Sequence, residues 1–353
     1  MRTIKKKAMS ARILLPALLL ASGLPAVTSC DKVPAGEQPG DTPIAFNSAV
    51  STKAPVKSED DMTEFAVWAA YNDMSGDPVS MVMDGIHVYR STSTGNEWTY
   101  DDIKLWRDGL WEFSALYPYP QSVNQDGNNI IEADCYAQKA EGQLEKGVYI
   151  QYYDGSAADI DLMLAEDSRQ YPDGGSGAVQ FTFSHILSKV SLAVKSEGNA
   201  EITVTDFKFS GMGVYGRYNY NDGLEPSAEE WQDKWRIIPH TVGEGGSMVE
   251  VPVGEFSLTQ SVSIGPAQTV TVLENLLLIP QTPGDRTNGH APISIEVSYT
   301  IGGQTETKTV SLPSSPSWEP GRRYRYTITV GTVDASLGVQ VLDWEEKDYT
   351  VEW

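Results

Sequence analysis

The chain has 353 residues, with 48 Asp and Glu against 26 Lys and Arg, and its formal net charge is −22. So acidic a chain repels the phosphate backbone of nucleic acids, which excludes them as partners, and it also repels anionic lipid head groups. Attachment to a membrane would therefore need a device other than a basic surface patch.

The first 29 residues have the composition of a bacterial secretion signal. Basic residues, among them Lys5 and Arg12, precede an apolar stretch from Ile13 to Ala21. A membrane-spanning helix needs about 20 apolar residues, so this stretch is too short to span. Small residues follow it, as expected before a cleavage site. We predict that residues 1–29 are a signal peptide, whose removal leaves 21 basic against 48 acidic residues.

A possible lipid attachment site follows this signal. The sequence Val27-Thr28-Ser29-Cys30 resembles a bacterial lipobox, which implies that the Cys30 thiol is acylated, with palmitate among the expected groups. One acyl chain binds a membrane only marginally, so a stable anchor needs more than one. The alternative is an ordinary secreted protein in which Cys30 has no special role. Residues 30–43 are polar and rich in Pro and Gly, which predicts a flexible tether.

Apolar residues at every second position dominate the rest of the chain. Such alternation is typical of strands with one face toward a core, and it recurs at residues 179–183, 202–204, 293–301 and 324–330. The sequence Ile301-Gly302-Gly303-Gln304 separates two such runs and predicts a hairpin turn. Helical patterns are scarce. The sequence therefore predicts an all-β protein with two sandwiches, residues 44–197 and 198–353.

Catalytic patterns are missing from the sequence. The glycine pattern of residues 211–216 matches a dinucleotide-binding motif, but an aromatic, turn-rich segment follows it in place of a helix. Asp159 and Asp161 would share one face of a strand, as paired-carboxylate chemistry requires. Acidic residues are abundant in this chain, which favours a solvated strand face instead. The four histidines have no metal-ligand spacing, and Cys135 has no activating partner in sequence. We expect no catalytic, cofactor or metal site, and no enzyme.

Three tryptophans lie close together in the sequence, at Trp98, Trp106 and Trp111. One interpretation is a platform on which sugars stack. The other is the large-residue core of a sandwich. Trp111 and Phe113 alternate within a run typical of a strand, which favours the core.

An ordered series of segments resembles the fimbrillin family of Bacteroidales, which comprises fimbrial subunits and related surface lipoproteins. The series covers nearly the whole mature chain and consists of PIAFNSAVSTKA (43–54), EFAVWAAY (64–71), WEFSALYPYP (111–120), DIDLMLAED (159–167), VQFTFSHILSKVSLAV (179–194), NLLLIPQ (275–281), WEPGRRYRYTITVG (318–331) and VQVLDWEE (339–346). The resemblance implies two transthyretin-like β-sandwich domains in tandem. It also implies export as a lipoprotein to the cell outer membrane and assembly into fimbriae.

In this family, proteolysis removes the first strand of a subunit, and a strand of another subunit fills the vacated groove. The removable strand here would be residues 44–50, with the cut after Lys53 or Lys57. The family's protease is specific for arginine, so the two lysines leave open a lysine-cutting protease or no cut at all. The end of the chain, where Tyr349, Val351 and Trp353 alternate with polar residues, either pairs in its own sheet or is donated to a neighbour.

The resemblance leaves two functions open. The first is a structural or adhesive fimbrial subunit, with other fimbrial subunits and host or bacterial surface receptors as its partners. The alternative is a stand-alone surface lipoprotein that binds glycans through aromatic side chains.

Overall fold

The computed structural model of the chain describes residues 42–50, 62–75, 79–92, 97–120, 130–140, 143–219, 234–238, 254–284, 292–331 and 335–344. All of them belong to one compact unit, residues 38–353. Its named elements are all strands, arranged in four sheets, so the prediction of an all-β protein is confirmed. The number of domains stays a prediction. The described residues include no helix long and apolar enough to cross a membrane.

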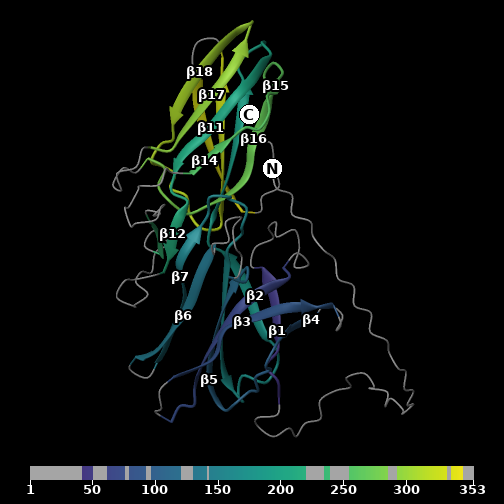
Figure 1. Cartoon of the computed structure of the whole chain (residues 1–353), viewed down its shortest axis with the longest axis vertical. Coiled ribbons are helices and arrows are strands. Elements are labelled where there is room, and N and C mark those ends of the chain that lie inside the picture. The colour runs from purple at the N-terminus through teal and green to yellow at the C-terminus, as the bar shows by residue number, and fades with distance from the viewer. Residues whose placement is uncertain are drawn as a thin grey trace, which may run out of the picture. The chain divides into compact units, whose positions relative to one another are not determined.

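The largest sheet has seven strands, in the order β1-β9-β8-β5-β2-β3-β4. Figure 1 labels its strands β1 to β5. All of its pairings are antiparallel except that of β1 with β9, which is parallel. Its strands are β1 (Phe46–Val50), β2 (Glu64–Asn72), β3 (Ser80–Ser91), β4 (Glu97–Tyr100), β5 (Gly109–Tyr117), β8 (Met163–Tyr171) and β9 (Val179–His185).

This sheet curls until its two edge strands meet. The Tyr100 hydroxyl at the end of β4 donates to the Ile44 carbonyl just before β1, at 2.9 Å. The rings of Phe46 and Tyr100 lie 5.4 Å apart. The curl encloses an aromatic core that includes Phe65, Trp106, Trp111, Phe113, Phe181 and Phe183.

The opposite face of the large sheet packs on a second sheet, of order β13-β12-β7-β6. Phe65 and Val67 of β2 belong to the aromatic core, whereas Ala66 and Trp68 pack with Tyr153 of the second sheet. Most of β2 is therefore buried on both faces. The second sheet consists of β6 (Ile131–Ala140), β7 (Gln143–Asp154), β12 (Tyr215–Tyr218) and β13 (Trp235–Ile237).

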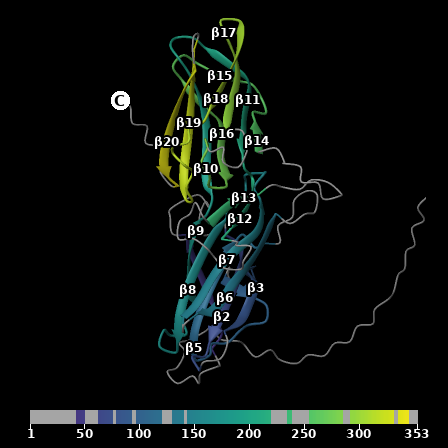
Figure 2. The same cartoon turned by 90° about the vertical axis from the view of Figure 1, so that its left-hand side faces the viewer.

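The remaining two sheets form a β-sandwich. Their orders are β16-β10-β19-β20 and β14-β11-β17-β18, with β15 paired to β11, and Figure 2 shows the strands of both sheets. Alternate residues of β10, β11, β17 and β19 fill one core between them. The strands are β10 (Ser188–Ser196), β11 (Ile202–Met212), β14 (Gly254–Ser257), β15 (Val262–Ile264), β16 (Thr269–Leu278), β17 (Ser294–Ile301), β18 (Gln304–Ser311), β19 (Arg322–Val330) and β20 (Ala335–Asp343).

The turn predicted between two alternating runs is confirmed. β17 and β18 pair antiparallel up to Ile301 and Gln304, and only two residues connect them. Gly302 and Gly303 both have positive φ, at 58° and 83°. A two-residue hairpin whose twist matches its strands needs positive φ at both positions, which glycine adopts without steric strain.

Sheet membership does not change at residue 197. β10 lies before that residue, yet it pairs with β16 and β19 of the sandwich. β12 and β13 lie after it, yet β12 pairs with β7 in the second sheet. Alternation shows which face of a strand is buried, but it does not identify the strand's partners.

Several buried polar groups gather where β9 ends and β10 begins. The rings of His185 and Trp344 stack at 4.2 Å, and the Lys189 Nζ lies 4.2 Å from the centre of the same indole. His185 Nδ1 lies 2.8 Å from Asp161 Oδ1. Asp161 precedes β8 in a loop, so the prediction of a solvated strand face is wrong there. Burial lowers the pKa of Lys189 to about 8, although the nearby Asp161 raises it.

Candidate functional site

The predicted modification, cleavage and donor positions all lie outside the part of the chain that the structure describes. They are Cys30, Lys53, Lys57, Tyr349, Val351 and Trp353. The strand that cleavage would release, β1, is described together with the residues that hold it.

Backbone hydrogen bonds hold the β1 region on both sides. Val179 N of β9 donates to the Ala45 carbonyl at 2.7 Å. On the other side, Ile44 N donates to the Lys104 carbonyl at 2.9 Å, and Trp106 N donates to Thr42 O at 3.0 Å. The region thus closes the gap between β9 and the segment that follows β4.

Two apolar side chains of this region enter the aromatic core. Ile44 is 1% exposed and Phe46 is 3% exposed. The Phe46 ring stacks on Phe181 at 5.7 Å and meets the edges of Phe65 and Phe113 at 6.5 and 6.3 Å. Burying each such side chain contributes about 1.5–3 kcal/mol. Loss of β1 would leave an apolar groove bordered by the unpaired edge of β9.

Ser48 fits this groove less well than Ile44 and Phe46 do. It follows Phe46 by two residues and faces the same side of the strand. Its Oγ is fully buried and has no hydrogen-bond partner among the described residues. An unpartnered buried hydroxyl costs about 1–3 kcal/mol, so β1 is not the best strand that this groove can hold.

We expect Ser48→Ala to raise the free energy of unfolding by about 1 kcal/mol, because it removes the unpartnered hydroxyl. Urea denaturation followed by circular dichroism measures the change. Ser196→Ala is the matched control: its buried Oγ donates to the Ala200 carbonyl at 2.7 Å, so this substitution should lower stability. Destabilisation by both substitutions would show that Ser48 has a partner.

Arg90, the first arginine after residue 29, is held within β3. Its Nε donates to the Met62 carbonyl at 2.9 Å, and its guanidinium lies 4.4 Å from the centre of the Trp98 ring. A protease needs an extended, accessible backbone around its cleavage site. The paired backbone of β3 makes Arg90 a poor substitute for Lys53 or Lys57.

The tryptophan cluster belongs mainly to the core, as the alternation of Trp111 and Phe113 predicted. Trp106 and Trp111 are both fully buried, with 0% exposure. Trp106 stacks on Tyr171 at 5.5 Å, and Trp111 stacks on Phe113 at 5.8 Å. The rings of Trp106 and Trp111 offer no face to a sugar, so a stacking platform made of these two residues is wrong.

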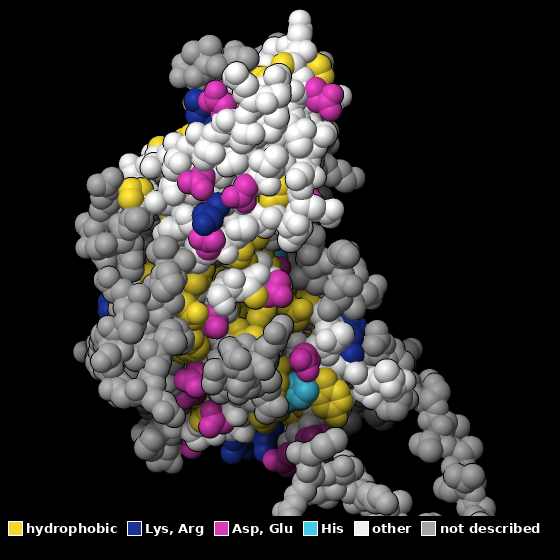
Figure 3. All heavy atoms as spheres, turned by 45° about the horizontal axis from the view of Figure 1, so that its top comes forward, with side chains coloured by type: hydrophobic (Ala, Val, Ile, Leu, Met, Phe, Trp, Pro, Cys, Tyr) yellow, Lys and Arg dark blue, Asp and Glu magenta, His cyan; other side chains and the backbone are white. Residues whose placement is uncertain are grey.

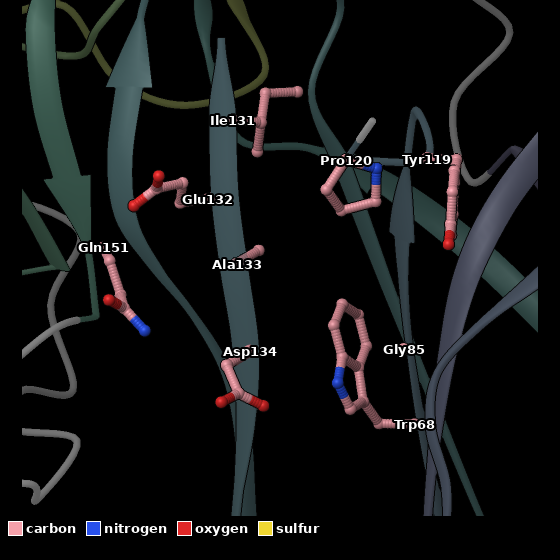
Figure 4. Close-up of a pocket in the computed structure, with 9 residues that line it drawn as sticks. All are labelled: Trp68, Gly85, Tyr119, Pro120, Ile131, Glu132, Ala133, Asp134 and Gln151. Atoms are coloured by element: carbon pink, nitrogen blue, oxygen red, sulfur yellow. The ribbon is translucent and has the colours of Figure 1, made fainter. Parts of the chain in front are cut away.

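An open pocket lies elsewhere, between the seven-stranded sheet and the second sheet (Figure 4). Its volume is about 420 Å³. The lining residues come from β2, β3, the segment that follows β5, β6 and β7, so no sequence pattern unites them. The lining residues are Trp68, Gly85, Tyr119, Pro120, Ile131, Glu132, Ala133, Asp134 and Gln151.

The other candidates from the sequence were Cys135, the glycine pattern of residues 211–216 and the histidines. Burial raises the pKa of the Cys135 thiol to about 11, so it stays protonated at neutral pH and is a poor nucleophile. Gly211, in the glycine pattern, has φ of 103° within β11, where the register with β14 shifts. The described residues contain no group of three His, Cys, Asp or Glu placed to hold a metal ion.

Comparison with known proteins gives one family match. The family model described as fimbrillin-like matches residues 52–344. No curated protein matches the chain.

Several solved structures are similar. A fimbrial protein from Bacteroides vulgatus is 17% identical with a TM-score of 0.57, and the match covers 86% of this chain and 100% of that one. A candidate cell adhesion protein from Bacteroides ovatus is 17% identical with a TM-score of 0.47, over 88% and 100% of the two chains. The first likeness supports the all-β fold.

Proposed function

This chain belongs to the fimbrillin-like family, a family of adhesion and structural proteins rather than enzymes, and we propose that it is a fimbrial subunit that assembles by strand exchange. The observation that carries the proposal is the placement of β1. It is an edge strand in parallel pairing with β9, and it buries Ile44 and Phe46 in the aromatic core. A strand from another subunit would satisfy the same backbone groups and refill the same core.

The end of the chain supplies the proposed donor. Tyr349, Val351 and Trp353 have the spacing of Ile44, Phe46 and Ser48, with a large or β-branched apolar residue at every position. An apolar side chain in the Ser48 position removes the unpartnered hydroxyl. The exchange is then favourable without any external energy source, once β1 has been cut from the domain.

The family places the protein at the cell surface. We propose that acylated Cys30 anchors the precursor in the outer membrane, and that a cut after Lys53 or Lys57 frees the mature subunit from this anchor. Its partners are then copies of itself or accessory fimbrial subunits, and surface receptors if it is adhesive.

N-terminal sequencing of the protein recovered from cells tests anchoring and processing together. Membrane-bound precursor should have a blocked N-terminus at Cys30, and fimbrial material should begin at Ala54 or Ser58. Cys30→Ala should move the precursor out of the membrane fraction. Fimbrial material that retains residues 44–50 would contradict processing, and unchanged lipid labelling of Cys30→Ala would contradict acylation.

A further inference from the structure

We propose that the pocket between the two sheets binds a neutral sugar residue. The inference does not rest on strand exchange, because the pocket lies on the face of the large sheet opposite the aromatic core that β1 fills. At about 420 Å³ it lies in the usual range for small-molecule sites, and one or two sugar rings would fill it.

Trp68 supplies a hydrogen-bond donor to the pocket. The residue is 3% exposed, and its indole nitrogen is not among the buried side-chain atoms that lack a partner. In Figure 4 the indole nitrogen faces β6, across the pocket. A ligand that fills the pocket would cover this donor, so it must offer the N–H a hydrogen-bond acceptor.

The other polar groups of the pocket are mostly acceptors. Glu132 is exposed, and Asp134 accepts from the Tyr149 hydroxyl at 3.1 Å and from Cys135 N at 2.7 Å. Each carboxylate oxygen has two lone-pair sites, so Asp134 can accept further bonds. The side-chain amide of Gln151 adds both a donor and an acceptor. The ligand must therefore offer donors as well as an acceptor.

The charge of the lining selects between ligand classes. The described lining residues include two carboxylates and no Lys or Arg, and these carboxylates repel an anionic ligand. Figure 3 shows acidic side chains beside exposed hydrophobic ones on the face drawn there. A cationic ligand would pair with the carboxylates, but an ammonium group has no acceptor for the Trp68 N–H. Hydroxyl groups both donate and accept, so a neutral polyhydroxyl ligand satisfies every group.

The apolar part of the lining fits the C–H faces of a sugar ring. Tyr119 and Pro120 form one wall, and the Tyr119 ring is fixed because His87 stacks on it at 4.2 Å. Gly85 lies beside the Trp68 indole: a Cβ built there would lie 3.5 Å from that ring. The absence of a side chain at Gly85 therefore leaves space next to the indole.

Titration of the ¹⁵N-labelled chain with sugars, followed by NMR of the indole N–H signals, tests the proposal. Trp68→Phe identifies the signal of Trp68 among the nine tryptophans. The neutral probes are D-glucose, D-galactose, D-mannose and N-acetyl-D-glucosamine. Glucuronate and glucosamine are the anionic and cationic probes. At least one neutral sugar should shift the Trp68 signal saturably at millimolar concentration, while glucuronate should not.

Glu132→Gln should weaken that binding by about tenfold, since hydrogen bonds to charged groups are the stronger ones. Glu201→Gln, which changes an exposed acid outside the pocket, should leave binding unchanged. The proposal is overturned if no neutral sugar moves the Trp68 signal, or if glucosamine alone binds. Neither result would bear on assembly, which is measured by particle size.

Discussion

Phe46→Ala is expected to lower the free energy of unfolding by about 3–5 kcal/mol, the usual loss when a buried phenylalanine is truncated. Phe46 is 3% exposed and contacts the rings of Phe65, Tyr100, Phe113 and Phe181. The cavity would lie at the point where the two edges of the large sheet meet, so β1 should also detach more readily.

Urea denaturation measures the loss of stability, and limited proteolysis of residues 42–61 measures the detachment. Asn47→Ala is the matched control, because Asn47 is exposed on the same strand and should change stability little. A loss below about 1 kcal/mol for Phe46→Ala would contradict the placement of β1 in the core.

Lys189→Met is expected to raise the free energy of unfolding at pH 7 by about 2 kcal/mol. Burial lowers the pKa of Lys189 to about 8 from its ordinary 10.5. Holding the proton at pH 7 therefore costs the folded state about 3 kcal/mol. Methionine removes this penalty but also forfeits about 1 kcal/mol of attraction between the ammonium and the Trp344 ring.

The sign of the pH dependence follows from the lowered pKa. Between pH 8 and 10.5 the unfolded chain keeps a proton on Lys189 that the folded chain has lost. The free energy of unfolding therefore rises with pH in that window. The advantage of Lys189→Met should therefore shrink between pH 7 and pH 9.5. Other titrating groups are common to both proteins and cancel in the difference.

Lys195→Met is the control for Lys189→Met, because Lys195 is exposed on the same strand, β10. It should change stability little at either pH. An advantage of Lys189→Met that is equal at pH 7 and pH 9.5 would show that the buried charge is not its cause.

Local patterns predicted the strands of this protein well. The alternation at 293–301 and 324–330 corresponds to β17 and β19, and the burial of Trp111 followed from its alternation with Phe113. These features depend on neighbouring residues, which the sequence displays directly.

Features that depend on distant strands could not be predicted in this way. β10 pairs with β19, more than 100 residues later, and β12 returns to β7, so a boundary placed at one polar segment does not follow the sheets. The pocket joins Trp68 to Asp134 and Gln151 from other strands. Their proximity follows from the packing of two sheets, which leaves no periodic trace in the sequence.

Cleavage of the purified precursor between β1 and β2, after Lys53 or Lys57, tests strand exchange most directly when particle size is followed by light scattering. The uncut protein should stay monomeric, because its own β1 fills the groove. The cut protein should release β1 and grow into particles of many subunits, and deletion of residues 345–353 should prevent that growth. Cut protein that has lost β1 and yet stays monomeric, or growth that persists after the deletion, would contradict assembly by donation of the C-terminal strand.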